Sequence, residues 1–500
     1  MASFVRKVPT ASGATAVQVV HKHGRAVVGI DHVGSAHDDV QLAVLMQVAA
    51  KRLRPGQGVL DLDGAGAGAR PRVVGTRCEV LWDVLTSTYA RLGFDELGDA
   101  GFRAMVLARL VEPTSKAEVI RVLDQIGAPG VSLRTLFRSL GRAQARDYRA
   151  LLASACLAHS ARLAGKAALI MYDCTTLHFT NELEDDLRKV GMSKEHRVDP
   201  QVQIGLLVDP AGFPLEVHLF DGAKAETTTL IPVLKAFQAR HGITDMVVVA
   251  DAGMLSAGNL NAIEDAGFAF IVGSRIVKAP YDLAEHFERH GNYFTDGQIL
   301  ESARIMGTGA GARSRRVVYQ WRFKREQRDQ KTINAQITKA EKVADGSRPL
   351  RRDRFVKISG AAKAVDWAVV ERARQLAGLK GYVTNLPATT MDGAAIIDAY
   401  HDLWHVEQSF RMTKSDLAAR PIFHHEREAI EAHITVVFAA LAIARDLQER
   451  SGMSIKRLIQ ALQPLLSVTI DIQGHQITAE PTITTETRTI LNKLTQSTGY

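Results

Sequence analysis

Short apolar runs that alternate with amphipathic segments between residues 166 and 275 constrain the fold of this 500-residue chain more than any other feature. The runs ALIMY, VQIGLLV, PLEVHLF, MVVVA and FAFIVG have the length and composition of buried strands. Residues 226–240 and 255–266 have the apolar spacing of helices, and DPAG at 209–212 predicts a hairpin turn. The order β-β-β-α-β-α-β is typical of a mixed sheet flanked by helices, an α/β fold.

Two of these strands are followed by an aspartate, which is a poor strand residue. Asp173 follows ALIMY, and Asp251 follows MVVVA. Either residue can cap the following turn or helix, but two such acids in one sheet favour a ligand site. If the strands are parallel neighbours, both carboxylates lie at the edge of the sheet where α/β proteins bind ligands.

A third acid lies in AYHDLWHVEQSFRMTK, within a helix predicted from about residue 389 to about residue 414. Tyr400, Glu407 and Lys414 are seven residues apart, which is close to two helical turns, so they are predicted to share one face. The alternative is a solvated Glu–Lys ion pair, which would not require the neighbouring Trp404 and Phe410.

Three carboxylates that converge on one point repel one another unless cations neutralise them. Oxygen ligands of this kind suit Mg²⁺ or Mn²⁺, and two such ions can support in-line displacement at a phosphodiester without a Ser or Cys nucleophile. Zinc is disfavoured, because His401 and His405 do not form an H-E-x-x-H motif and no third ligand is evident.

These segments resemble the DDE transposases of bacterial insertion sequences, in particular the group with a long β insertion before the glutamate. MYDCTTLHF carries the first acid, GMSKEHRVDPQVQIGLLVDPAGFPLEVHLFDG follows it, and VVVADAGMLS carries the second acid. YHDLWHVEQSFRMTK is similar to the family motif Y-x2-R-x3-E-x6-K, with Leu403 at the position of the motif's arginine and Arg411 as a possible replacement. The resemblance covers residues 165–450 well.

The resemblance implies an RNase H-like core in which Asp173, Asp251 and Glu407 are the catalytic acids and bind two Mg²⁺ or Mn²⁺ ions. Tyr400 and Lys414 would contact phosphates near the scissile bond. Such an enzyme binds the terminal inverted repeats of its element, cleaves the ends and joins their 3′-hydroxyls to target DNA. The resemblance also implies double-stranded DNA as partner, a homodimer on paired ends, and action in the bacterial cytoplasm at the nucleoid.

Positive charge is concentrated in residues 301–357, which contain 16 Lys and Arg against 6 Asp and Glu, whereas the whole chain carries only +8. This segment lies in residues 276–388, where RVVYQWRF, DRFVKI and GYVTNL predict a mostly β insertion into the core. A basic run is either a solvated face or a surface that follows phosphates. Because the insertion falls between the second and third acids, we expect it to grip DNA.

One tryptophan lies within this basic segment. Trp321 is followed closely by Arg322, Lys324 and Arg325, and an aromatic ring among cations can stack on an unpaired base. The alternative is a core tryptophan of a small β domain.

Residues 81–165 are predicted to be helical. Ser115 begins an S-x-x-E capping box, and Ser132 is a plausible N-cap for LRTLFRSLGRA. Two short helices joined by a glycine-containing turn, with Arg134, Arg138 and Arg142 on the second, fit a helix-turn-helix that binds DNA. An ordinary αα-hairpin with solvated arginines fits equally well.

The composition and the remaining segments complete the expected organisation. Three cysteines cannot form a disulfide framework, and the longest apolar stretch, 434–444, is too short to span a membrane, so a cytosolic protein is expected. The predicted regions are a small β-containing region with a Gly/Ala-rich linker at 61–72 (1–80), a helical DNA-binding region (81–165), the RNase H-like core (166–275 and 389–450), the insertion (276–388) and a C-terminal region (451–500).

Two other functions share parts of this pattern. A nuclease of the same core would hydrolyse DNA without strand transfer and would keep all three acids. A non-catalytic DNA-binding protein derived from a transposase would have lost an acid, and all three are present.

Overall fold

The computed structural model describes residues 2–495 except 11–12, 25, 54–71, 165–168, 193–196, 244, 255, 275, 277–280, 352, 360–361 and 473–474. The chain forms two compact units, Met1–Val80 with Gln460–Ile483 and Leu81–Ile459 with Thr484–Tyr500. The predicted linker at 61–72 lies outside the described residues except for Arg72. None of the described helices is long and apolar enough to cross a membrane.

The smaller unit contains two antiparallel three-stranded sheets, which confirms its predicted β content. The first has the order β1 (Ala2–Pro9), β2 (Thr15–His23), β3 (Ala26–Ala36), and α1 (Asp39–Leu53) packs against it. The second has the order β16 (His475–Ala479), β15 (Ser467–Ile472), β4 (Arg72–Arg77). The pairing of β4 with a strand almost 400 residues later leaves no local signal in the sequence.

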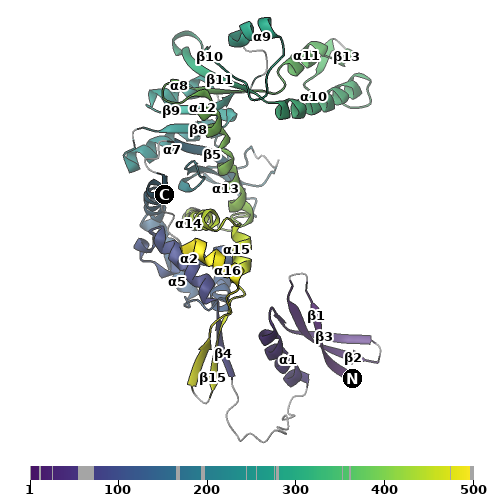
Figure 1. The fold of residues 1–500 in the computed structure, drawn as a ribbon, viewed down its shortest axis with the longest axis vertical. Coiled ribbons are helices and arrows are strands. Elements are labelled where there is room, and N and C mark those ends of the chain that lie inside the picture. The colour runs from purple at the N-terminus through teal and green to yellow at the C-terminus, as the bar shows by residue number, and fades with distance from the viewer. Residues whose placement is uncertain are drawn as a thin grey trace, which may run out of the picture. The chain divides into compact units, whose positions relative to one another are not determined.

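The larger unit is built on an eight-stranded mixed sheet with the order β10-β11-β14-β9-β8-β5-β6-β7 (Figure 1). Its strands are β5 (Leu169–His178), β6 (Gln201–Val208), β7 (Pro214–Asp221), β8 (Val247–Ala250), β9 (Ala269–Ser274), β10 (Ile299–Met306), β11 (Arg313–Trp321) and β14 (Leu379–Thr384). Strand β8 runs parallel to β5 and β9, and the other neighbours are antiparallel. With α7 (Glu226–His241) and α8 (Ala257–Asp265), β5 to β9 confirm the predicted β-β-β-α-β-α-β order. A short 3-10 turn, η2 (Ala252–Met254), follows β8.

The segment 276–388 is not the mostly β insertion that was predicted. Strands β10, β11 and β14 extend the main sheet beyond β9, and the longest element of the segment is the helix α10 (Phe323–Ala344). Its apolar residues Ile333, Ile337 and Ala340 form a stripe at helical spacing, which the many charged residues around it obscure. This stripe forms a small core with the hairpin β12–β13 (Val356–Ser359, Ala362–Val365) and the helix α11 (Trp367–Gln375). The segment also contains η3 (Tyr281–Leu283), α9 (Ala284–His290) and η4 (Gly309–Gly311).

The predicted helical region is confirmed. It consists of α2 (Glu79–Arg91), η1 (Phe94–Leu97), α3 (Ala100–Val111), α4 (Lys116–Gln125), α5 (Leu133–Ala145) and α6 (Tyr148–Ala164). Both predicted caps form, because the hydroxyls of Ser115 and Ser132 accept hydrogen bonds from the N–H groups of Glu118 at 3.3 Å and Thr135 at 3.1 Å. These caps fix where α4 and α5 begin.

A central helix, α14 (Arg427–Ser451), joins the helical region to the sheet. It packs against α3, α5, α6, α13 (Trp404–Ser415), α16 (Thr485–Thr495) and β7. Every residue from Ala432 to Leu447 is buried, so this stretch of α14 is enclosed on all sides. The short helix α15 (Ile455–Leu462) follows it.

Candidate active site

Asp173 lies in β5 and Asp251 directly follows β8, and these strands are parallel neighbours, which is the condition under which the sequence analysis expected the two acids to meet. In the pairing of β5 with β8, Met171 lies opposite Val249, and each aspartate is two residues further along its strand. This register places the backbone of Asp173 and that of Asp251 at corresponding positions of the two neighbouring segments. Asp251 is exposed and directly follows β8, but Asp173 is not at a strand end, because β5 pairs with β6 as far as His178.

Tyr400 reaches this pair of acids from α12 (Gly393–His401). Its hydroxyl donates a hydrogen bond to Oδ1 of Asp251 at 3.2 Å, and the N–H of Ala252 donates to the same oxygen at 2.6 Å. Burial, and after it the negative charge of Asp251, raises the pKa of Tyr400 far above its ordinary value. The phenol therefore keeps its proton and acts as a donor beside the carboxylate.

Strands β9 and β14 hold Tyr400 in place through residues that the sequence did not single out. A Cβ atom at Gly273 would overlap the Tyr400 hydroxyl, so only glycine leaves room there. The ring of Tyr382 packs edge-on against Tyr400 at a centroid distance of 5.0 Å, and Lys380 Nζ lies 5.2 Å from the centre of the Tyr400 ring. Two features of the sequence could have pointed to these residues, namely the glycine in FAFIVGS and the lysine in the strand LKGYVT.

The beginning of α10 adds positive charge beside Tyr400. Burial is the main cause that lowers the pKa of His401, and the charges of Arg325 and Arg322 lower it further, whereas Asp398 raises it. Arg325 also acts on the pKa of Tyr400. Residues from the middle of the basic segment 301–357 therefore lie near Tyr400, and the expectation that this segment grips DNA stays a prediction.

Three arginines of β11 are paired with acids, and one of the three is fully buried. Arg313 pairs with Asp265 at 2.6 Å, and the fully buried Arg315 pairs with Glu264 at 2.8 Å. Arg316 pairs with a glutamate of β10. The exposed cations of the segment are mostly on and beside α10, namely Arg322, Lys324, Arg328, Lys331, Lys339 and Lys342.

Trp321 has the contacts of a core residue. Its indole Nε1 donates to the carbonyl oxygen of Ala377 at 3.0 Å, and its ring is stacked with Phe294 at a centroid distance of 6.0 Å. These contacts favour the core role over stacking on a base.

The predicted helix through Tyr400, Glu407 and Lys414 is interrupted. Helix α12 ends at His401 and α13 begins at Trp404. Across the joint the N–H groups bond to carbonyls three residues earlier, for example Leu403 N to Tyr400 O at 3.2 Å, which is the pattern of a tightened 3-10 turn. Tyr400 therefore belongs to a different helix from the other two residues.

The joint between α12 and α13 also contains Leu403, which stands where the family motif has an arginine. Leu403 is 8% exposed and contributes to the core, so it does not present a polar group to the site. Arg411 is exposed on α13, and Lys414 is half-buried in its last turn.

Glu407 is exposed in the first turn of α13, which packs against β5 and β6. Across the described residues, no three His, Cys, Asp or Glu side chains are grouped so that they could hold a metal ion. The structure thus brings Tyr400 into hydrogen-bond contact with Asp251, beside the strand that contains Asp173, and does not group Glu407 with them. Arg134 and Arg138 are exposed on α5, whose other side packs against α3, α4 and α14.

We expect Tyr400→Phe to lower the rate of DNA cleavage about tenfold, because a hydrogen bond to a charged group contributes roughly 1.5–3 kcal/mol. The fold should be unaffected, since the ring and its packing remain. The measurement is single-turnover cleavage of labelled DNA with Mg²⁺, beside a thermal unfolding curve. Tyr382→Phe is the matched control, because its hydroxyl lies 3.3 Å from His401 Nε2 and not beside Asp251. Equal rates for the two variants would contradict a role for the Tyr400 hydroxyl.

The chain is similar to known proteins over the region that contains Asp173, Asp251 and Glu407. A family model described as "Transposase DDE domain" matches residues 165–443. No curated protein sequence matches the chain. A solved chain in the cryo-EM structure of a piggyBac transposase synaptic complex with hairpin DNA is similar at 9% identity and a TM-score of 0.39, over 77% of this chain and 77% of that chain.

Proposed function

This chain belongs to the transposase DDE domain family, and from that premise we propose that it cleaves the ends of a bacterial insertion sequence and joins their 3′-hydroxyls to target DNA. The observation that carries the proposal is the position of Asp173 and Asp251 at matching places on two neighbouring parallel strands. The proposed catalytic core is RNase H-like and comprises β5 to β9 with α7 and α8. The strand order and the acids at the β5–β8 edge support this assignment.

The carboxylates fit a divalent metal site. Asp173 and Asp251 would hold Mg²⁺ or Mn²⁺ between them, and oxygen ligands of this kind are the ones that these ions prefer. Glu407 would complete a two-ion site once α13 approaches the strands with DNA bound. When bound, the ions would activate the attacking oxygen and stabilise the leaving oxygen of the phosphodiester.

The chain's own residues would position the DNA at this edge. Tyr400 keeps a proton on its hydroxyl, and with DNA bound it would redirect this single hydrogen bond from Asp251 to a phosphate oxygen. Arg322, Arg325 and Lys380 place positive charge beside Tyr400, which attracts the DNA backbone. Lys414 and Arg411 would add phosphate contacts from α13.

The DNA ends would be gripped by surfaces on both sides of the core. We assign phosphate contacts to the exposed cations of α10, including Lys324, and groove contacts to Arg134 and Arg138, with α4 and α5 as a helix-turn-helix. Two copies of the chain would act on paired ends, so that both inverted repeats are cut together, in the bacterial cytoplasm at the nucleoid.

The test is strand transfer into supercoiled plasmid with Mg²⁺, using a pre-cleaved duplex from inverted repeats beside the coding region. Joined plasmid products, abolished by EDTA, are the expected result. Hydrolysis of the duplex without joining would instead identify the RNase H-like nuclease. Binding of the duplex with neither reaction would identify the non-catalytic alternative.

A further inference from the structure

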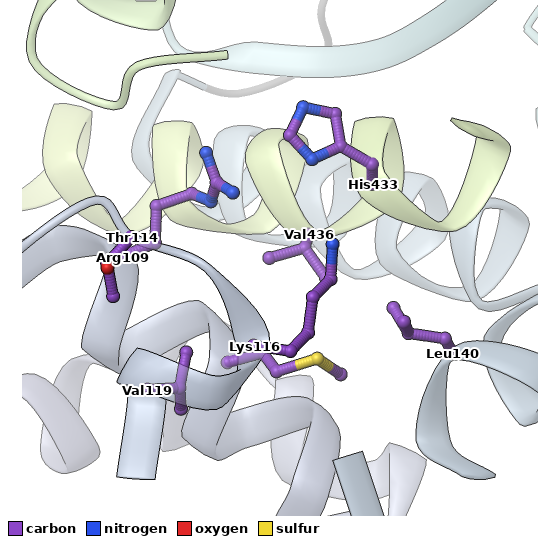
Figure 2. A pocket seen from close by; sticks show the side chains of 8 residues that line it. Arg109, Thr114, Lys116, Val119, Leu140, His433 and Val436 are labelled. Carbon is purple, nitrogen blue, oxygen red and sulfur yellow. The ribbon is translucent and has the colours of Figure 1, made fainter. Parts of the chain in front are cut away.

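A pocket lies within the larger unit, between α3, α4 and α14, apart from the candidate active site. It is lined by the polar groups of Arg109, Thr114, Lys116 and His433 and by apolar side chains. Figure 2 shows the ends of Arg109 and Lys116 and the ring of His433 on the same side of the pocket, with Val119 and Leu140 on its flanks. The proposed catalytic role uses none of these residues.

Among the described residues, no acid forms an ion pair with either cation of the pocket. Burial lowers the pKa of Arg109 to about 10, and burial together with the nearby charge of Arg109 lowers the pKa of Lys116 to about 8. No carboxylate is among the groups that act on either residue. At neutral pH both remain charged, so two like charges lie close together in a half-buried site, an arrangement that is costly without an anion.

The surrounding groups fix the orientation of these cations. Arg109 Nη1 donates to the carbonyl oxygen of Leu417 at 2.7 Å, and Lys116 Nζ contacts Nε2 of His424. Burial, followed by the charges of Lys116 and Arg109, lowers the pKa of His424 to about 4, so its ring is neutral and can accept from the lysine. His433 is buried, its pKa is lowered well below its usual range by burial and the same cations, and its Nε2 donates to the carbonyl oxygen of Ala419 at 3.1 Å.

The backbone adds further donors. Lys116 is the first residue of α4, and the Ser115 hydroxyl caps only the N–H of Glu118. The first N–H groups of a helix and its dipole favour an anion at this end. Thr114, whose side chain carries a hydroxyl, also lines the pocket.

We propose that this pocket is an anion site that takes a phosphate group, bound chiefly by Arg109 and Lys116. Two cations, a hydroxyl and free helix N–H groups match the several oxygens of a tetrahedral phosphate. The phosphate can come from the DNA backbone or from free inorganic phosphate. The anion site does not depend on the proposed function, whereas assigning its phosphate to DNA does.

The first experiment measures binding of inorganic sulfate, a tetrahedral anion that does not titrate near neutral pH, to the full chain by calorimetry. Lys116→Met keeps the apolar stem of the side chain and removes its charge. We expect it to weaken sulfate binding about tenfold or more, whereas Lys235→Met, at an exposed lysine of α7 that does not line the pocket, leaves binding unchanged. The variant should unfold at the same temperature or higher, because it removes an unpaired charge. Wild-type binding by Lys116→Met, or no sulfate binding by the wild type, would overturn the proposal.

A pH series gives an independent readout of the same site. The titratable or charged groups that act on Lys116 or face it are Arg109 and the neutral rings of His424 and His433. Since Lys116 loses its proton near pH 8, sulfate affinity in the wild type should fall between pH 7 and pH 9. The residual affinity of Lys116→Met should stay level across that range, and an equal fall in the variant would count against the assignment.

The source of the phosphate is resolved by DNA binding without metal, so that no cleavage occurs. If the DNA backbone enters the pocket, Lys116→Met reduces duplex affinity and lowers the salt slope by about one. Lost sulfate binding with unchanged duplex affinity and slope assigns the site to free phosphate. Neither result depends on strand transfer, so failure of the anion site and failure of the proposed function are distinguishable.

Discussion

Replacing Asp251 with asparagine is expected to lower metal-dependent DNA cleavage by about 10³-fold or more, while the chain stays folded. A divalent ion stabilises transition-state charge by several kcal/mol, and each 1.4 kcal/mol changes a rate about tenfold. Asparagine keeps the shape of the side chain but loses the charge that holds the ion. It also keeps an oxygen that can accept from Ala252 and Tyr400, the two donors that Asp251 has here.

The matched control is Asp245→Asn, an exposed acid just before the other end of β8. It should cleave DNA at the wild-type rate, and both variants should bind DNA without metal as the wild type does. Full activity of Asp251→Asn would remove this residue from the mechanism and with it the proposed active site. Asp173→Asn should match Asp251→Asn in the same assay.

Whether Glu407 takes part in DNA cleavage is a separate question, because the structure places it on α13 and does not group it with the two aspartates. If α13 moves when DNA binds, Glu407→Gln should lose activity to a similar extent as Asp251→Asn. If Glu407→Gln retains full activity, the two aspartates hold the metal without Glu407. The similarity of this segment to the family motif would then not identify a catalytic residue.

Local patterns explain why much of the catalytic region was predictable. A buried strand, a helix cap and a tight hairpin each depend on a few consecutive residues, so β5 to β9 and the caps of α4 and α5 follow directly from the sequence. The adjacency of Asp173 and Asp251 was also predictable, since it needs only that their two strands be parallel neighbours.

The parts that were missed depend on contacts between distant segments. The sequence does not indicate that Arg315 is buried, because its partner Glu264 lies in α8, 51 residues earlier. The stripe of α10 is short and surrounded by charge, so the helix is hidden until its partners in α11 and the β12–β13 hairpin are known. The break between α12 and α13 has no Pro or Gly to mark it.

A buried carboxylate in the helical region leads to the largest stability effect that we expect. Asp99 caps α3, and its side chain is 1% exposed. It accepts four hydrogen bonds, from Phe102 N at 3.0 Å, Ser139 Oγ at 2.7 Å, Arg142 Nε at 2.7 Å and Tyr148 Oη at 3.0 Å. It therefore ties the start of α3 to α5 and to the first turn of α6.

Asp99→Ala should lower the free energy of unfolding by about 3–5 kcal/mol, the cost of breaking a buried ion pair by removing one partner. Arg142 would keep its charge without the carboxylate, and the hydroxyls of Ser139 and Tyr148 would lose their acceptor. Thermal unfolding and hydrogen exchange of α3 and α5 measure the effect. Asp124→Ala, at an exposed acid of α4, is the control and should change stability by no more than about 0.5 kcal/mol.

The same network predicts a dependence on pH. Burial alone would raise the pKa of Asp99, but the hydrogen bonds from Arg142, Ser139, Phe102 and Tyr148 outweigh it and hold the pKa well below the usual range. A depressed carboxylate pKa contributes stability above the unfolded value of about 3.9, and this contribution is lost as the pH falls below it. Acidification from pH 5 to pH 2 should therefore destabilise the wild type more than Asp99→Ala, and equal losses would show that Asp99 is not ionised in the fold.

Because Arg142 forms an ion pair with Asp99, Arg142→Ala should also destabilise the protein. Substitution of the exposed Arg134 or Arg138 should leave stability unchanged and affect DNA binding alone.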